Sequence, residues 1–191
     1  MYLSELGRHG EAIAEAKEAK SEIPSPANAC LAWTLWAGGE NEKALHQALV
    51  ATELYPSSMF ATVTAGLAYE HNGMYRESIA EFERGIQTNG CSIFIGFQCH
   101  ALARSGDKEN AWKNIRRLEN LSKERYVAPS HFAIAFAGLE EKESAIRALQ
   151  AAYENRDNFL IMAQMIPQFD NLRSDQRFQD LLHRMNFPSL S

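Results

Sequence analysis

Apolar and polar residues along the chain follow one pattern five times. Each copy has a turn, usually at a glycine, and a small residue five positions later, inside the start of an amphipathic helix. The copies begin at residues 7, 39, 73, 106 and 140 and read GRHGEAIAEAKEA, GENEKALHQALVA, GMYRESIAEFERG, GDKENAWKNIRRL and EEKESAIRALQAA. A spacing of 32–34 residues predicts stacked helix pairs, because one pair cannot bury its apolar side alone.

Small residues recur at two positions of each copy, seven residues apart. The first position holds Ala12, Ala44, Ser78, Ala111 and Ala145. The second holds Ala19, Ala51, Gly85, Leu118 and Ala152. Both positions lie on one face of the second helix of a pair, where a long side chain would hold the partner helix away. Leu118 therefore predicts a wider helix crossing in the fourth copy. Pro24 and Pro56 are expected to end second helices.

One copy resembles a known repeat in detail. Residues 59–92 are similar to a tetratricopeptide repeat (TPR) at nearly every signature position, which here hold Gly66, Tyr69, Gly73, Tyr75, Ser78, Phe82 and Gly85. Residues 25–58 fit the same frame. The last copies fit it more loosely, because Glu140 replaces the turn glycine, and Cys99 and Ala133 stand where another glycine is usual.

The resemblance implies an all-α, right-handed TPR superhelix. Residues 1–156 would form the array, with a partial repeat at 1–24 and repeats at about 25–58, 59–92, 93–125 and 126–156. Residues 157–191 would form a tail with a capping helix near Asp175–Met185. The first helix of the partial repeat retains only about Met1–Leu6, which predicts an uncovered apolar N-terminal edge.

The C-terminal part resembles the closing part of TPR regions in bacterial signalling proteins. Those proteins join such regions to adenylate cyclase, serine/threonine kinase or winged-helix transcription-regulator domains. The matching residues are Tyr126, Val127, Pro129, Pro167, Phe169, Asp170, Leu172, Arg173, Asp175, Arg177, Phe178 and Leu181. This resemblance implies a bacterial signalling context.

The TPR frame also implies which residues line the concave surface of the array. The candidate groove residues are Trp33, Trp36, Phe60, Val63, Leu67, His71, Phe97, His100 and His131. This set is mainly aromatic and apolar, and it lacks the Lys/Asn/Arg clamp with which chaperone-binding TPR domains hold a C-terminal carboxylate. We hypothesise that its large apolar members anchor an extended or helical peptide. Two alternatives are that the chain's own segment Asn158–Phe169 fills the groove, or that a second copy does.

Catalytic and metal chemistry have little support in the sequence. His71, His100 and His131 could face the groove near Glu70, but no H-x-x-x-H or H-E-x-x-H spacing occurs. Cys99 precedes His100, yet adjacent helix positions do not face each other. No Walker, G-x-S-x-G or dinucleotide glycine motif occurs. We therefore expect no enzyme activity, metal or cofactor.

Charge and cysteine content indicate which partners and which cellular location the sequence favours. The net charge is −5, and residues 1–90 hold 12 acidic side chains against 6 basic ones. This balance argues against nucleic acid or a membrane surface as a direct partner. The basic cluster Lys113, Arg116 and Arg117 is read as solvated outer surface. Three cysteines without C-x-x-C spacing, and no signal peptide or membrane span, favour a cytoplasmic location.

These patterns together predict a non-catalytic protein-interaction or regulatory module. It would bind a protein or peptide in the apolar groove, and it could form a homodimer through the groove or through the N-terminal edge. The alternative function is a sensory domain that binds a small apolar ligand in the groove and signals to an attached effector domain.

Overall fold

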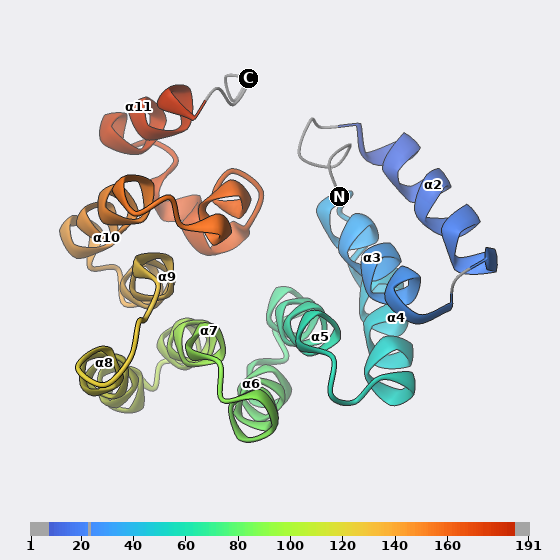
Figure 1. Cartoon of the computed structure of the whole chain (residues 1–191), viewed down its shortest axis with the longest axis horizontal. Coiled ribbons are helices and arrows are strands. Elements are labelled where there is room, and N and C mark those ends of the chain that lie inside the picture. Colours follow the sequence, from blue (N-terminus) through green and yellow to red (C-terminus); the bar gives the residue numbers. More distant parts are fainter. Residues whose placement is uncertain (1–7, 23, 186–191) are drawn as a thin grey trace. The chain divides into compact units, whose positions relative to one another are not determined.

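The described chain consists of helices joined by short turns, and no strand occurs in it. The computed structural model describes residues 8–22 and 24–185 (Figure 1). Its helices group into two compact units, Met1–Gly90 and Cys91–Ser191. The partial first helix predicted at Met1–Leu6 lies outside the described residues.

The first unit is built from successive helices that pack on one another. They are α2 (His9–Glu22), α3 (Pro24–Ala37), α4 (Asn41–Leu54), α5 (Met59–His71) and α6 (Tyr75–Asn89). Each helix packs against the next one, and α3 also packs against α5. The helices α3 and α4 therefore form one pair and α5 and α6 form another, with the first helices of the two pairs as neighbours.

The second unit repeats this plan and adds a tail. Its elements are α7 (Ser92–Arg104), α8 (Lys108–Ser122), α9 (Pro129–Gly138), α10 (Lys142–Glu154), the 3₁₀ turns η1 (Asn158–Met162) and η2 (Pro167–Leu172), and α11 (Gln176–Arg184). α7 packs on α8 and α9, and α9 packs on α10. η1 and α11 contact α10, while η2 contacts α9. α11 buries Phe178, Leu181 and Leu182, and the tail thereby adds apolar cover to the last helix pair.

The turn inside each pair has one backbone conformation. Gly39, Gly73 and Gly106 have φ of 80°, 73° and 93°, and Glu140 adopts the same left-handed conformation with φ of 64°. In all four turns the amide of the next residue donates to the carbonyl five positions back, as from Glu141 to Phe136 at 2.9 Å. This Schellman closure satisfies the last carbonyls of the first helix. The repeated glycine is thus explained, and Glu140 is a strained substitute for it.

We expect Glu140→Gly to raise the free energy of unfolding by about 0.5 kcal/mol. The left-handed conformation costs a residue with a Cβ about 1–2 kcal/mol, and the greater freedom of glycine in the unfolded chain offsets part of the gain. Gly106→Ala should have the opposite effect, a loss of about 1 kcal/mol, since no neighbouring atom lies within 4 Å of the added Cβ and only backbone strain acts. Urea unfolding of both variants tests this, and a loss of stability in Glu140→Gly would contradict it.

The small positions of the repeat are buried, as the sequence predicts. Ala44, Ser78, Ala111 and Ala145 have 0% exposure, and Ala12 has 4%. The second small position is also buried at Ala51, Gly85, Leu118 and Ala152; the side chain of Ala19 is outside the described set. The wider crossing predicted at Leu118 stays a prediction. One close contact is explicit, because a Cβ on Gly66 would lie 2.3 Å from the ring of Phe82.

Glycines also set the contact between the first helices of the second unit. A Cβ on Gly96 of α7 would lie 2.6 Å from the carbonyl oxygen of His131 in α9. A Cβ on Gly138 of α9 would lie 2.5 Å from Cα of His100 in α7. Both obstacles are backbone atoms, so α7 and α9 touch along their main chains. This contact buries the two histidines that the sequence assigns to the groove.

Candidate functional site

The nine predicted groove residues are divided between the two units. Trp33, Trp36, Phe60, Val63, Leu67 and His71 belong to α3 and α5 of the first unit. Phe97, His100 and His131 belong to α7 and α9 of the second unit. The residues therefore form two separate sets, one in each unit.

The aromatic residues of the first unit form one cluster. Trp33 and Trp36 lie one turn apart on α3, with ring centroids 4.9 Å apart. Phe60, from the first turn of α5, lies 5.9 Å from Trp33. His71, at the other end of α5, meets Trp36 edge to face at 6.4 Å. Because α3 packs against α5, these four rings from two helices form a continuous chain of contacts, which we call the α3–α5 aromatic cluster.

The α3–α5 aromatic cluster runs from a buried end to an open one. Trp33 is 1% exposed and Trp36 is 5% exposed, whereas Phe60 is half-buried and His71 is exposed. Val63 and Leu67, the other predicted groove residues of α5, are buried. The predicted residues of this unit therefore contribute mainly to packing, and solvent reaches the cluster at Phe60 and His71.

Both tryptophans carry a buried donor without an acceptor. Neither Nε1 of Trp33 nor Nε1 of Trp36 has a hydrogen-bond partner among the described residues. Buried indole N–H groups normally find an acceptor, and leaving one unpaired costs about 1–3 kcal/mol. Two such donors on adjacent turns of α3 are an uncommon feature for a purely structural core.

The first helices of the second unit are covered by the chain itself. Phe97 is fully buried, and the ring of Phe159 in η1 meets it edge to face at 5.7 Å. Leu160, Ile166 and Phe169 of the same tail are also buried. The alternative that the chain's own tail packs on a groove residue therefore holds at Phe97.

His131 lies in a buried polar contact of the second unit. Oγ of Ser92 lies 2.9 Å from Nδ1 of His131, and the amide of Ser130 donates to Asp157 at 3.0 Å. Burial lowers the pKa of His131 to about 4, and the Asp157 carboxylate raises it slightly. Although serine, histidine and aspartate meet here, Ser92 and His131 are buried from solvent.

Cys99 has the environment of a core residue. It is fully buried, its Sγ donates to the carbonyl of Ala111 at 3.1 Å, and burial raises the pKa of its thiol to about 12. A thiol with that pKa forms almost no thiolate near neutral pH, so the Cys99–His100 neighbourhood lacks a nucleophile. Within the described ranges, no three His, Cys, Asp or Glu side chains gather closely enough to hold a metal ion. No helix in those ranges has the length and apolar character needed to cross a membrane.

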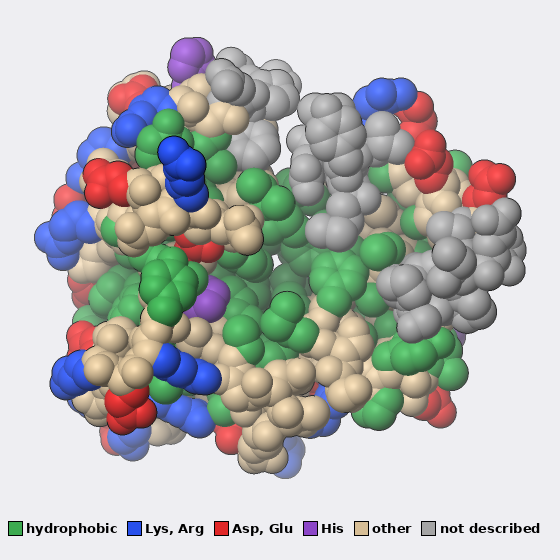
Figure 2. All heavy atoms as spheres, in the orientation of Figure 1, with side chains coloured by type: hydrophobic (Ala, Val, Ile, Leu, Met, Phe, Trp, Pro, Cys, Tyr) green, Lys and Arg blue, Asp and Glu red, His purple; other side chains and the backbone are tan. Residues whose placement is uncertain are grey.

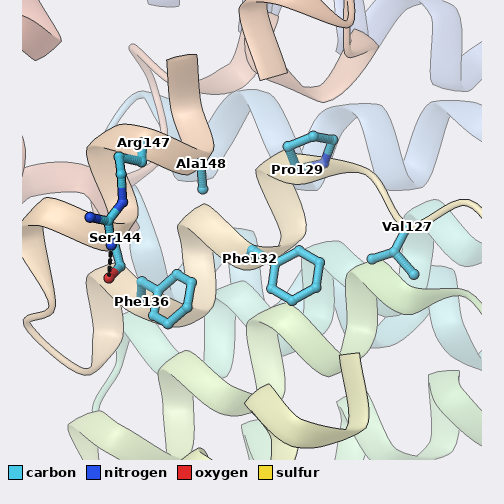
Figure 3. A pocket seen from close by; sticks show the side chains of 7 residues that line it. All are labelled: Val127, Pro129, Phe132, Phe136, Ser144, Arg147 and Ala148. Carbon is cyan, nitrogen blue, oxygen red and sulfur yellow. Dashed lines mark hydrogen bonds between the residues drawn. The ribbon is translucent and has the colours of Figure 1, made fainter. Parts of the chain in front are cut away.

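Sequence reasoning missed a depression on α9 and α10. It has a volume of about 330 Å³, and its floor includes the stacked rings of Phe132 and Phe136, with centroids 6.4 Å apart (Figure 3). The two phenylalanines are one turn apart in an apolar stretch of the sequence. That spacing predicts two aromatic rings on one face of a helix. The TPR frame, however, assigns the groove to other positions of the same helix.

Comparisons with known proteins decide the fold. No protein-family model matches the sequence, and neither does any curated protein. A tetratricopeptide repeat protein from Parabacteroides merdae has a similar structure, with a TM-score of 0.54 and 11% identity over 97% of this chain and 75% of that chain. This chain has the TPR fold. The all-α TPR class predicted from the sequence is thereby confirmed.

A second TPR structure is also similar. It is YrrB, described as a TPR protein with an unusual peptide-binding site, with a TM-score of 0.49 and 19% identity over 88% of this chain and 89% of that chain.

Proposed function

We propose that this TPR chain is a non-catalytic module that binds a polypeptide at the α3–α5 aromatic cluster. The carrying observation is the pair of buried indole N–H groups on Trp33 and Trp36, which have no acceptor among the described residues. A polypeptide presents a carbonyl acceptor at every residue. An extended or helical segment entering beside Phe60 and His71 would supply acceptors to the indoles and apolar area to the rings.

The composition of the cluster favours a polypeptide over an ion or a highly charged ligand. Tryptophan contributes a large apolar area together with a polar N–H, and it is enriched among residues that dominate protein-binding energy. Val63 and Leu67 support the rings from within α5. The proposal that the chain lacks enzyme activity is supported by the burial of Cys99, Ser92 and His131, which removes these three groups from solvent.

We expect peptides selected from a random display library to bind the wild-type chain and to bind Trp36→Phe about tenfold more weakly. Phenylalanine keeps an apolar ring but lacks the N–H, and one hydrogen bond contributes about 0.5–1.5 kcal/mol. Binding is measured as the change in tryptophan fluorescence in a Trp112→Phe background, so that only Trp33 and Trp36 report. Trp112 lies on α8 and is 37% exposed.

The control for that experiment is Trp112→Phe itself, which should bind the selected peptides as the wild type does. Equal affinity for wild type and for both Trp33→Phe and Trp36→Phe would contradict peptide binding at this cluster. Thermal stabilisation by small apolar compounds, with no peptide selected, would instead support a small-ligand sensor.

The wider setting is proposed from the sequence. The resemblance of the C-terminal residues leads us to propose a bacterial, cytoplasmic signalling role, in which residues 1–156 form the array and 157–191 the tail. We propose no direct contact with nucleic acid or membrane. A homodimer through the α3–α5 aromatic cluster would appear in sedimentation equilibrium as a dimer that Trp36→Phe weakens.

A further inference from the structure

The depression on α9 and α10 carries an aromatic floor with a cation at one end. Its lining residues are Val127, Pro129, Phe132, Phe136, Ser144, Arg147 and Ala148. In Figure 3 Val127 and Pro129 lie toward Phe132, whereas Ser144 and Arg147 lie toward Phe136. An apolar surface therefore leads to a guanidinium group within one depression.

The first unit has a depression at the equivalent positions of its helix pair α3 and α4. A smaller depression there is lined by Leu31 and Leu35 of α3 and by Lys43, His46 and Gln47 of α4, among others. Counted from the turn residues Gly39 and Glu140, these five are the equivalents of Phe132, Phe136, Ser144, Arg147 and Ala148. The two depressions therefore lie at equivalent positions of two different helix pairs.

In the first unit α2, the second helix of the preceding copy, lies against this surface. α2 packs on α3, and its Lys17 lines the depression. Leu31 and Leu35 are only 4% and 3% exposed. This helix buries the small residues Ala12 and Ala16 and leaves Glu11, Glu15 and Lys17 exposed.

In the second unit the corresponding helix of the preceding copy is α8, which contacts α9 but contributes no residue to the lining of the depression. The connection from α8 to α9 is six residues long, 123–128, compared with four between α4 and α5. α9 packs closely on α7 and α10, and Phe132 and Phe136 remain half-buried on its remaining face. Two aromatic rings are left partly open where the first unit buries two leucines.

The positive charge of Arg147 at the depression indicates which kind of partner would bind there. Arg147 is exposed, and its hydrogen bond within the described residues goes to Oγ of Ser144 at 3.1 Å. Glu143, one turn earlier, would be the usual helical partner of Arg147. However, both carboxylate oxygens of Glu143 accept from Arg177 of α11, at 2.7 and 2.9 Å. Arg147 keeps an electrostatic interaction with Glu143 but makes no hydrogen bond to it among the described contacts, and its side chain lines the depression.

Basic side chains also gather around this part of the chain. Residues 91–191 hold 13 Lys and Arg against 12 acidic residues, in contrast to 6 against 12 in residues 1–90. On the face shown in Figure 2, Lys and Arg side chains lie over α8, α10 and α11 with Asp and Glu side chains among them. The near-balance of charge means that this unit repels a negatively charged partner less than the acidic residues 1–90 do.

We propose that this depression is a docking site for an acidic amphipathic helix of a partner protein. The apolar side of that helix would cover Phe132 and Phe136, as α2 covers Leu31 and Leu35. A Glu or Asp one turn away on the helix would accept from Arg147. The site is separate from the α3–α5 aromatic cluster, and the two can succeed or fail independently.

Two labelled synthetic helices of 18 residues test the proposal by fluorescence anisotropy. Both carry the same Leu/Ala stripe, one with Glu and the other with Lys on its remaining positions. We expect the Glu helix to bind the wild-type chain and the Lys helix not to bind. Arg147→Glu should weaken the Glu helix at least about tenfold, because a charged hydrogen bond becomes a repulsion. Phe136→Ala should weaken it as well.

The matched control is Arg116→Glu, which makes the same charge change on α8 outside the depression. The Glu helix should bind this variant within about twofold of the wild type, since screened distant charges act weakly. Equal loss in Arg116→Glu and Arg147→Glu, binding of neither helix, or preference for the Lys helix would each overturn the proposal. A concentration-dependent dimer abolished by Arg147→Glu would also overturn it, because a second copy would then be the occupant.

Discussion

Gly138→Ala is expected to destabilise the second unit by about 3 kcal/mol or more. The added Cβ would lie 2.5 Å from Cα of His100, and a main-chain atom in a packed helix cannot turn aside as a flexible side chain can. The α7 and α9 helices must therefore separate, which opens the contact between them along its length. Overpacking of this kind is among the few mechanisms that give large effects from one methyl group.

Trp112 fluorescence during urea unfolding measures this effect in the second unit, in a background where Trp33 and Trp36 are replaced by phenylalanine. Gly96→Ala should behave like Gly138→Ala, since its Cβ would lie 2.6 Å from the carbonyl oxygen of His131. Gly106→Ala is the control with an unobstructed Cβ, and it should cost about 1 kcal/mol. If Gly138→Ala costs no more than Gly106→Ala, then α7 and α9 do not touch through their main chains.

The second large effect is a loss of stability in mild acid that depends on His131. Burial holds the pKa of this histidine near 4, below the ordinary value of 6.5. Between these two pH values the unfolded chain binds a proton that the folded chain does not. The free energy of unfolding therefore falls as the pH falls from 6.5 to 4, by about 3 kcal/mol in total from this group. Above pH 6.5 the contribution is constant.

His131→Asn should remove most of that pH dependence. Asparagine cannot take up a proton in this range, and its side-chain oxygen can accept a hydrogen bond from Ser92. The measurement is urea unfolding at several pH values from 4 to 8, with His183→Asn as the control, because His183 is an exposed histidine of α11. An acid-induced loss of equal size in wild type and His131→Asn would assign the effect to other groups.

Much of the fold could be predicted from local patterns. The small positions identified by the repeat, such as Ala44 and Ala145, are buried in the structure because close helix packing leaves no space for longer side chains. The turn glycines have left-handed backbones for a reason that is also local, and even the deviation at Glu140 follows the same conformation. A pattern repeated five times in phase is readable because each copy is stabilised mainly by its neighbours.

Less of the candidate site could be predicted from the sequence. The repeat frame places Trp33 and Trp36 together correctly as neighbours on one helix, but it does not show that their N–H groups lack acceptors. Nor does it show that Phe97 lies beneath Phe159, which is 62 residues away in the sequence. Contacts of this kind depend on where the tail runs, and the tail has no repeat by which to place it.

The sequence by itself determined the helical repeat, its turns and its small packing positions, because these depend on residues within one period of about 34. Only the tertiary structure decided which faces remain open. Glu143 bonds to Arg177 because α11 packs on α10. Phe132 and Phe136 stay half-buried beside a depression that α8 does not line, whereas α2 lines the equivalent depression of the first unit. The exposure of a side chain depends on which other segments pack against it on folding, and a local sequence pattern does not specify those segments.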